Sequence, residues 1–209
     1  RIKVWEAVDL WASLYPKAVD GNRLLDQLGL ADKRHASFMT LSGGQKQRLF
    51  IALALINDPE VVFLDELTTG LDPQARHLIW ERLRSLMAQG KTILLTTHFM
   101  DEAERLCHRL AVMDRGRLVA SGAPRELITR HIEPQVVEVY GDGAQEWADS
   151  FGRQAAQRCE KTGETLFCYT RDADAIVHDL DRRGNVRYLH RPANLEDVFL
   201  KLTGRELRD

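Results

Sequence analysis

The stretch Val61-Val62-Phe63-Leu64-Asp65-Glu66 decides the fold. It opens with a short continuous apolar run, rich in β-branched side chains, that is typical of a strand buried on both faces of a sheet. The run ends in two adjacent carboxylates, Asp65 and Glu66. Ligands bind at the carboxyl ends of the strands in open α/β sheets, so we expect both acids at a binding edge. The simpler alternative is a strand that ends in solvent.

The two carboxylates also indicate what would bind there. Neighbouring acids near a core repel each other and are costly unless a cation is present. A magnesium ion together with phosphate oxygens would remove this cost. The pair Asp65 and Glu66 therefore points to a metal and phosphate site.

The residues that follow predict a parallel sheet. Asp72-Pro73 is an N-cap with proline at the first helical position, and an apolar stripe then runs to Gly90. Residues 92–96 are expected to form a second buried strand, so strand, helix and strand make one crossover unit. A helix from Met100 to about residue 109 and two strands around residues 110–113 and 117–120 are expected to complete it.

The second strand also ends in polar residues, Thr96-Thr97-His98. A lone histidine is more often structural than functional. His98, however, is expected at the same sheet edge as Asp65 and Glu66. Titratable groups that neighbouring strands deliver to one edge are what a phosphoryl-transfer site needs.

The sequence before the strand is helical in pattern. Residues 4–14 and 24–30 carry apolar positions at helical spacing, and Pro16 separates them. The segment Leu41-Ser42-Gly43-Gly44-Gln45 then precedes an apolar stretch, residues 49–55, which we expect to be a buried helix. Ser42 can cap this helix, and its free N–H groups and dipole would favour phosphate. A plain loop followed by an N-cap is the alternative.

The pattern of expected secondary structure changes after Ile128. Strand-like segments at residues 136–140, 166–169 and 186–189 alternate with helical stretches near Trp147, Ile176 and residues 198–200. This pattern predicts a small separate α+β module of ordinary domain size. We therefore expect two domains, residues 1–129 and residues 130–209.

Composition excludes several classes of protein. The 209 residues hold 29 basic and 31 acidic side chains, a formal net charge of −2, so no overall field attracts nucleic acid and no nucleic-acid partner is expected. The longest apolar run, residues 49–56, is far shorter than the roughly 20 residues of a membrane-spanning helix. Cys107, Cys159 and Cys168 form no CxxC pair, which favours reduced thiols in structural positions over a metal site.

Four ordered motifs resemble the ABC ATPase family over residues 1 to about 125. Leu41 to Gln45 matches the signature motif, Val61 to Glu66 resembles the Walker B strand, Gly70-Leu71-Asp72 resembles the D-loop, and His98 occupies the place of the switch histidine. The implied fold is α/β, a P-loop NTPase-type parallel sheet with a helical subdomain and a missing N-terminal part, plus the small C-terminal α+β module.

The resemblance implies a role for each matched residue, with ATP and Mg²⁺ as cofactors. Asp65 would hold the metal ion, Glu66 would polarise the attacking water, and His98 would contact the γ-phosphate. Asp72 would link the two active sites of a dimer. The signature residues would contact ATP bound to the opposite subunit; they are Ser42, Gly43, Gly44 and Gln45.

Two departures from the family pattern matter. Family members usually have proline after the catalytic glutamate, whereas this chain has Leu67, which frees a backbone torsion. In addition, no GxxxxGK[ST] P-loop occurs and no Q-loop glutamine is identifiable. The chain also begins with Arg1 and not with an initiator methionine. We therefore expect an ATPase that is truncated at its N-terminus. Such a chain is expected to be inactive by itself and to expose apolar surface.

The finer resemblance is to bacterial drug and lipo-oligosaccharide exporters. Thr68 to Pro73 and Asn194 to Gly204 resemble these proteins, and His77 to Arg105 is most similar to nodulation-factor exporters. The implied function is ATP-powered export of a lipo-oligosaccharide, drug or polysaccharide. A second nucleotide-binding subunit and a membrane permease would be the partners, at the cytoplasmic face of the inner membrane. A non-transport ABC ATPase and a catalytically incomplete regulatory fragment are the alternatives.

Overall fold

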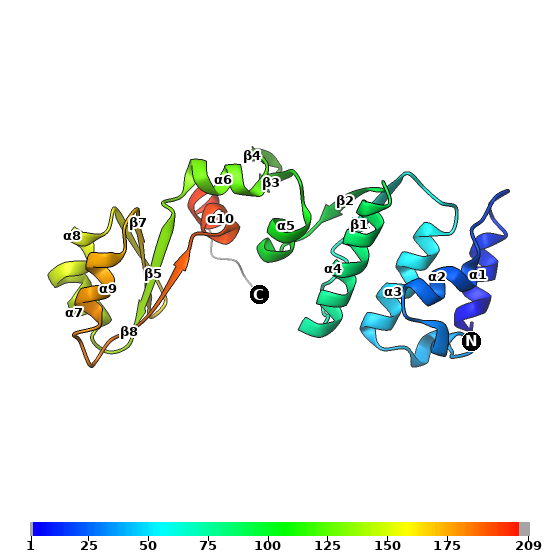
Figure 1. Ribbon diagram of the computed structural model, residues 1–209, viewed down its shortest axis with the longest axis horizontal. Helices are drawn as coiled ribbons and strands as arrows, with labels where there is room; N and C mark the ends of the chain where they lie inside the picture. The colour runs from blue at the N-terminus through cyan, green and yellow to red at the C-terminus, as the bar shows by residue number, and fades with distance from the viewer. Residues whose placement is uncertain (1, 205–209) are drawn as a thin grey trace. The chain divides into compact units, whose positions relative to one another are not determined.

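The computed structural model describes residues 2–204. The chain divides after Glu102 into two compact units, each with its own internal contacts. Figure 1 shows a helical part and a parallel strand pair in the first unit, and two antiparallel sheets with their helices in the second. The domain boundary expected after residue 129 is not tested by this division and stays a prediction.

The helical subdomain opens the first unit. Asp20 caps its second helix, because the Asp20 carboxylate accepts a hydrogen bond of 2.9 Å from the Asn22 backbone N–H. The expected buried helix extends further than residues 49–55 and is not apolar all round, since Phe50 is 48% exposed. The elements are α1 (Val4–Ala12), α2 (Gly21–Gln27), the short 3₁₀ helices η1 (Ala31–Lys33) and η2 (Phe38–Thr40), and α3 (Gly43–Leu55).

The expected strand–helix–strand unit is present. Strand β1 (Val61–Asp65) pairs in parallel with β2 (Thr92–Thr96), and helix α4 (Pro73–Ala88) connects them. Helix α5 (Met100–Leu106) follows and ends earlier than predicted. The parallel α/β fold class is therefore confirmed by the structure.

The prediction that β1 and β2 are buried on both faces is wrong for the described residues 2–204. Val62 and Leu64 are buried, but Phe63 is 72% exposed and Leu94 is 54% exposed. Strand side chains alternate between the two faces of a sheet, and here only one face of this strand pair is covered. The apolar run predicted the strand correctly. Such a run does not indicate which face of the strand another part of the protein covers.

The second unit begins with an antiparallel pair. Strands β3 (Leu110–Asp114) and β4 (Arg117–Gly122) pair with each other, and helix α6 (Pro124–His131) follows. The sequence predicted that these strands would complete the parallel unit. That prediction is wrong, because β3 and β4 form a sheet of their own. Only two residues, Arg115 and Gly116, separate the two strands, so a local hairpin forms more readily than a distant pairing.

A four-stranded antiparallel sheet forms the rest of the second unit. Its strand order is β6-β7-β5-β8. Helical segments cover the face that carries Val137, Val139 and Leu166, and Trp147 and Ile176 are fully buried against it. The elements are β5 (Gln135–Tyr140), α7 (Ala144–Trp147), the π-helical turn η3 (Ala148–Gly152), α8 (Arg153–Ala155), β6 (Arg158–Thr162), β7 (Thr165–Thr170), α9 (Asp174–Leu180), β8 (Arg187–Pro192) and α10 (Leu195–Thr203).

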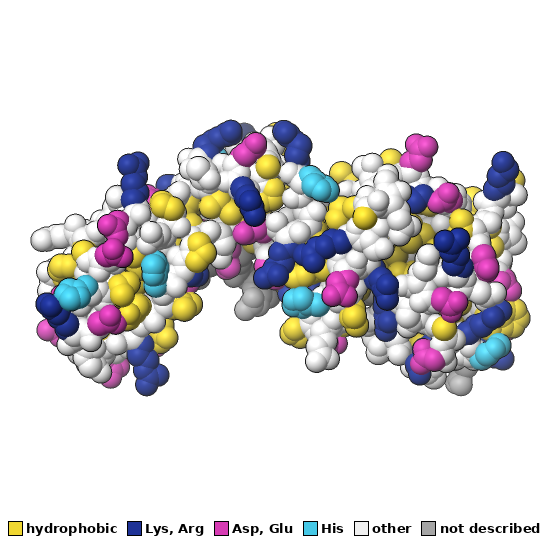
Figure 2. Space-filling view, viewed as in Figure 1, with side chains coloured by type: hydrophobic (Ala, Val, Ile, Leu, Met, Phe, Trp, Pro, Cys, Tyr) yellow, Lys and Arg dark blue, Asp and Glu magenta, His cyan; other side chains and the backbone are white. Residues whose placement is uncertain are grey.

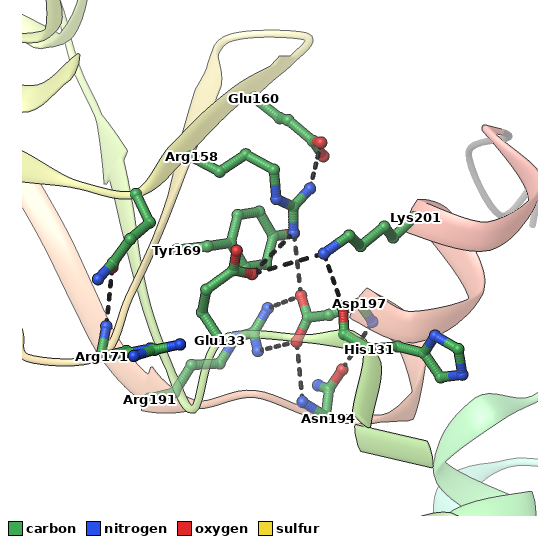
Figure 3. A network of polar contacts seen from close by, with 11 residues as sticks. His131, Glu133, Arg158, Glu160, Tyr169, Arg171, Arg191, Asn194, Asp197 and Lys201 are labelled. Atoms are coloured by element: carbon green, nitrogen blue, oxygen red, sulfur yellow. Dashed lines mark hydrogen bonds and ion pairs between the residues drawn. The ribbon is translucent and has the colours of Figure 1, made fainter. Parts of the chain in front are cut away.

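The closing helix α10 packs against α6 through the apolar stripe expected from the sequence, with Leu195 and Val198 buried. Asp197 is 1% exposed and fixes the helix to the sheet (Figure 3). Its carboxylate accepts hydrogen bonds from both terminal nitrogens of Arg191, at 2.7 and 3.0 Å, and from the Asn194 backbone at 2.8 Å. The Tyr169 hydroxyl donates a further bond of 3.2 Å. Four donors thus compensate the buried charge of Asp197.

The hydrogen-bond network around Asp197 shifts the pKa values of two of its members, Arg191 and Tyr169. Burial alone would lower the pKa of Arg191, but its hydrogen bonds to Asp197 and Glu138 outweigh burial and raise that pKa. Burial and the negative charge of Asp197 raise the pKa of Tyr169. Both partners therefore hold their protons throughout the physiological range, and the network stays intact.

Replacing Asp197 with alanine should destabilise the second unit by about 3 kcal/mol, because it leaves a partly buried guanidinium without one of its anions. Urea unfolding followed by the fluorescence of the buried Trp147 measures this change. The exposed Asp142, changed to alanine, is the matched control and should leave the midpoint unchanged within error. Equal midpoints for the two variants would contradict the structural role of the Asp197 network.

The surface carries both signs of charge. On the face shown in Figure 2, Lys and Arg side chains are interspersed with Asp and Glu in both units. Within residues 2–204, none of the helices combines the length and the apolar character needed to cross a membrane.

Candidate nucleotide-binding site

The carboxyl ends of β1 and β2 bring the predicted catalytic residues together. The parallel register places Asp65 directly opposite Thr96, and Glu66 and His98 follow within two residues. The Thr96 hydroxyl donates a hydrogen bond to the Asp65 carboxylate. His98 Nδ1 lies 3.3 Å from Glu66 Oε1. Asp65, Glu66 and His98 thus form one polar group at this sheet edge.

Glu66 has an unusual backbone conformation. Its φ angle is 43°, in the left-handed region that side-chain-bearing residues rarely adopt. Its backbone N–H donates to the Thr96 carbonyl at 3.0 Å and lies 3.3 Å from the Thr96 hydroxyl oxygen. Strained residues of this kind persist where the surrounding structure holds them, and they concentrate at functional sites.

Leu67 follows Glu66 and replaces the usual proline of the family. It is 6% exposed, so it contributes an apolar side chain to the core of the first unit. The loop continues with backbone bonds from Thr69 to Glu66 at 3.1 Å and from Leu71 to Thr68 at 3.2 Å. These turns hold the loop without the fixed torsion of a proline.

An aromatic side chain supports His98. The rings of His98 and Phe99 have centroids 4.2 Å apart, and the Arg76 guanidinium carbon lies 4.1 Å from the centroid of the Phe99 ring. A cation over a ring face is attracted by the ring quadrupole. His98 is therefore held between Glu66 and a Phe99 ring that Arg76, from α4, keeps in place.

Ser42 caps helix α3 as the sequence predicted. The Ser42 hydroxyl accepts a bond of 3.3 Å from the Gln45 backbone N–H, and the Gln45 side chain accepts one of 2.9 Å from the Ser42 backbone N–H. This reciprocal capping box fixes the turn. A hydroxyl that accepts one bond can still donate its own hydrogen, so Ser42 can bind an outside oxygen. The Gln45 side-chain oxygen is instead engaged in the cap.

The signature glycines lie beside the D-loop. A Cβ atom added to Gly44 would come within 3.1 Å of the Ala75 side chain, and one added to Gly43 would lie 3.5 Å from the side chain of Leu71. Asp72 caps α4 by accepting a bond of 2.9 Å from the Ala75 backbone. Ser42, Gly43, Gly44 and Asp72 therefore form a second group.

The two groups of predicted residues are separate in their contacts. In the part of the chain that the structure describes, the hydrogen bonds join Glu66 with His98 and Asp65 with Thr96, and join Ser42 only with the first turn of its own helix. No hydrogen bond among the described residues therefore joins the Ser42 group to the Asp65, Glu66 and His98 group.

The donor set at the sheet edge fits magnesium only together with phosphate. Across residues 2–204, no three His, Cys, Asp or Glu side chains converge on a common metal position. Mg²⁺, however, usually takes only one or two protein carboxylates and completes its shell with waters and substrate phosphates. The exposed Asp65 carboxylate, oriented by Thr96, is an oxygen ligand of the right kind.

Sequence reasoning missed the residues that orient the site. Thr96 was part of a recognised polar segment, but its bonds to Asp65 and Glu66 depend on the register between two strands. Phe99 and Arg76 gave no signal, because their contact joins α4 to a loop more than twenty residues later. The polar residues Thr96-Thr97-His98 at the end of the apolar run were the sign in the sequence for Thr96.

Solved structures of ABC transporter subunits share this architecture. An ATP-binding cassette of an ABC transporter matches 63% of the chain and 59% of that structure, with a TM-score of 0.56 and 25% identity. A subunit from Clostridium perfringens, part of the ABC transporter complex cbiONQ, matches 61% of the chain and 53% of that structure, with a TM-score of 0.55 and 29% identity. In sequence and in fold, the chain is similar to the ATP-binding proteins of ABC transporters.

Within that class, the chain is similar to the Nod factor export ATP-binding proteins. It is 58% identical over 186 residues to Nod factor export ATP-binding protein I of Paraburkholderia xenovorans (strain LB400), which covers 89% of this chain and 61% of the relative. The protein of the same name from Cupriavidus pinatubonensis (strain JMP 134 / LMG 1197) is 59% identical over 186 residues, with coverages of 89% and 57%. The chain therefore spans about three fifths of the length of these curated relatives.

Two family models match parts of the chain. The model described as "Nodulation factor export protein NodI, C-terminal domain" matches residues 145–204, within the second unit. An AAA domain model matches residues 16–99, which include the signature, the strand pair and His98. The resemblance to nodulation-factor exporters that the sequence motifs predicted is confirmed.

Proposed function

We propose that this chain supplies the hydrolytic half-site and the signature half-site of an ATPase that powers an ABC exporter. The observation that carries the proposal is the sheet edge where Asp65, Glu66 and His98 meet, with His98 Nδ1 3.3 Å from Glu66 Oε1. Carboxylates and an imidazole delivered by adjacent parallel strands suit phosphoryl transfer from a nucleotide.

Each predicted residue has a distinct role in binding. Asp65 would hold Mg²⁺, since its carboxylate is exposed and oriented by the Thr96 hydroxyl. Ser42 and the first-turn N–H groups of Gly43 and Gly44 would contact phosphate oxygens of ATP on the opposite subunit. Gln45 would act through the capping box that orients Ser42. Asp72 would link the two sites of the dimer, because it caps α4 beside the signature glycines.

The chemistry assigned to the chain is proton transfer and positioning. Glu66 accepts a proton from the attacking water while the oxygen of that water forms the new bond to the γ-phosphorus, the bond from that phosphorus to the β–γ bridging oxygen breaks, and ADP leaves with the bonding electrons. His98 contacts the γ-phosphate and is kept in place by Glu66 and Phe99. Bound Mg²⁺ would neutralise the charge that develops on the phosphate oxygens.

The finer parts of the proposal follow the names of the relatives. Two Nod factor export ATP-binding proteins are 58% and 59% identical to this chain, and this similarity supports a role in export. The proposed substrate class is a lipo-oligosaccharide, and drugs or polysaccharides are further candidates. A second nucleotide-binding subunit and a membrane permease would be the partners. The chain would then act at the cytoplasmic face of the inner membrane, as a peripheral subunit.

A mixing experiment tests the two half-sites. It uses a chimera in which a P-loop-bearing segment of a curated Nod factor export relative precedes Arg1. Ser42→Arg and Glu66→Gln chimeras should each be inactive, because every site of each dimer holds one defect. Mixing them should restore phosphate release to roughly a quarter of the unmodified rate, since half of the dimers carry one intact site.

The mixing result separates the proposal from its alternative. A mixture that stays as inactive as its components would show that the Ser42 and Glu66 half-sites serve the same nucleotide within one chain. Size-exclusion chromatography with light scattering in ATP confirms that the mixed subunits associate. Mixing two Ser42→Arg preparations is the control and should restore nothing.

A further inference from the structure

Two cysteine sulfur atoms face each other in the second unit, far in sequence from the proposed ATPase residues. Cys159 lies on β6 and Cys168 on β7, their residues are direct register partners, and their Sγ atoms are 2.9 Å apart. We propose that Cys159 and Cys168 are a redox-active thiol pair that a low-molecular-weight disulfide, such as oxidised glutathione, converts into an intramolecular disulfide.

The backbone already has the geometry that a disulfide requires. Directly opposed residues of antiparallel strands have Cα atoms about 4.5–5.5 Å apart, within the range of about 4.4–6.8 Å seen for disulfides. Both side chains lie on the face that packs against Trp147, where Cys168 belongs to the core and Cys159 borders it. A short turn after Thr162 joins the strands, so no distant segment has to move.

Cys159 is the thiol that reacts first. The hydrogen bond from the Cys168 thiol lowers the pKa of Cys159, and the positive charges of Arg153 and Arg158 add to this effect against the opposing effect of burial. The thiolate is the nucleophile in disulfide exchange. Cys159 is also only partly buried and lies on β6, an edge strand of its sheet.

Cys168 is the resolving thiol. Its hydrogen bond to Cys159, its burial, and the negative charge of the Cys159 thiolate all raise the pKa of Cys168. Two of these three causes come from Cys159 and disappear once the Cys159 sulfur is part of a neutral mixed disulfide. The first reaction therefore prepares the second, while burial protects Cys168 from direct attack by an outside disulfide.

The reaction balances in two exchange steps. The Cys159 thiolate attacks one sulfur of oxidised glutathione, forms a mixed disulfide and releases one glutathione thiolate. Cys168 gives its proton to solvent, attacks Cys159 Sγ and releases the second glutathione thiolate. Two protein thiols are oxidised to one disulfide, and one glutathione disulfide is reduced to two thiols.

Peptide mapping of the 209-residue chain tests the proposal. After exposure to oxidised glutathione, the chain should lose two of its three titratable thiols and the mass of two hydrogen atoms. Proteolysis without reduction should yield one linked pair of peptides that contains Cys159 and Cys168. Dithiothreitol should restore all three thiols. An unchanged thiol count, or a bridge that includes Cys107, would overturn the proposal.

Serine variants test the order of the steps. Cys168→Ser should stop at a stable glutathionyl adduct on Cys159, whereas Cys159→Ser should leave Cys168 unmodified. Cys107→Ser is the matched control and should form the same bridge as the original chain. Equal modification of Cys168 with and without Cys159 would refute the assigned order. Circular dichroism checks that each variant is folded, and the map of the unmodified chain stands without any variant.

Discussion

Replacing Glu66 with glutamine in the P-loop chimera is expected to slow phosphate release by a factor on the order of 10² or more. The amide keeps the size of the side chain but cannot accept the proton of the attacking water. ATP binding should be preserved, because Glu66 contacts His98 and its proposed role is to act on the attacking water, not to bind the nucleotide. Phosphate release and the binding of a fluorescent ATP analogue measure the two effects separately.

A matched glutamate provides the control. Glu81 is an exposed carboxylate on α4, and its replacement by glutamine should change neither turnover nor nucleotide affinity. Turnover by the Glu66→Gln chimera at the unmodified rate would exclude Glu66 as the general base. A loss of ATP affinity as large as the loss of turnover would assign Glu66 to binding.

The 209-residue chain by itself should release no phosphate above background, whereas the chimera should turn over. No GxxxxGK[ST] stretch occurs in its sequence, so this chain does not provide the backbone cradle and lysine that hold the phosphates. Asp65, Glu66 and His98 can supply the metal ligand, the base and a γ-phosphate contact. Without the cradle, however, the reacting atoms are not positioned, and positioning supplies a large part of such catalysis.

Side-by-side assays of the chain and the chimera measure this difference, with and without Mg²⁺. A denatured sample of each protein sets the background. Strong Mg²⁺-dependent release by the 209-residue chain that disappears in Glu66→Gln would contradict the prediction of an incomplete site. Release that persists in Glu66→Gln would instead come from a contaminating phosphatase.

Local pattern predicted most of the elements and failed where the pattern is weak. The strands at residues 61–65 and 92–96, and the cap at Asp72, follow from apolar runs and helix-start residues. Strand β6 was missed because Arg158 to Thr162 is polar, as exposed edge strands often are. Strands β3 and β4 were predicted as strands, but they were assigned to the parallel unit, whereas they pair with each other. An apolar run does not specify the strand with which it pairs.

The exposed face of the parallel pair shows a similar limit. Phe63 and Leu94 are as apolar as Val62, yet they are exposed in the described structure and Val62 is buried. Hydrophobicity measures the free energy gained if a side chain is covered. Whether it is covered depends on which element packs over that face.

The sequence by itself determined the resemblance to ABC transporter ATP-binding proteins, the order of the motifs and the identity of the candidate residues Ser42, Asp65, Glu66, Asp72 and His98. These depend on residue type and on spacing along the chain, which a linear sequence contains in full. Only the tertiary structure decided that Thr96 orients Asp65, that Phe99 and Arg76 hold His98, and that Cys159 meets Cys168. The contacts between Thr96 and Asp65, between Arg76 and Phe99, and between the two cysteines each join segments far apart in the sequence. Their approach depends on strand register and side-chain packing, which no local window of sequence encodes.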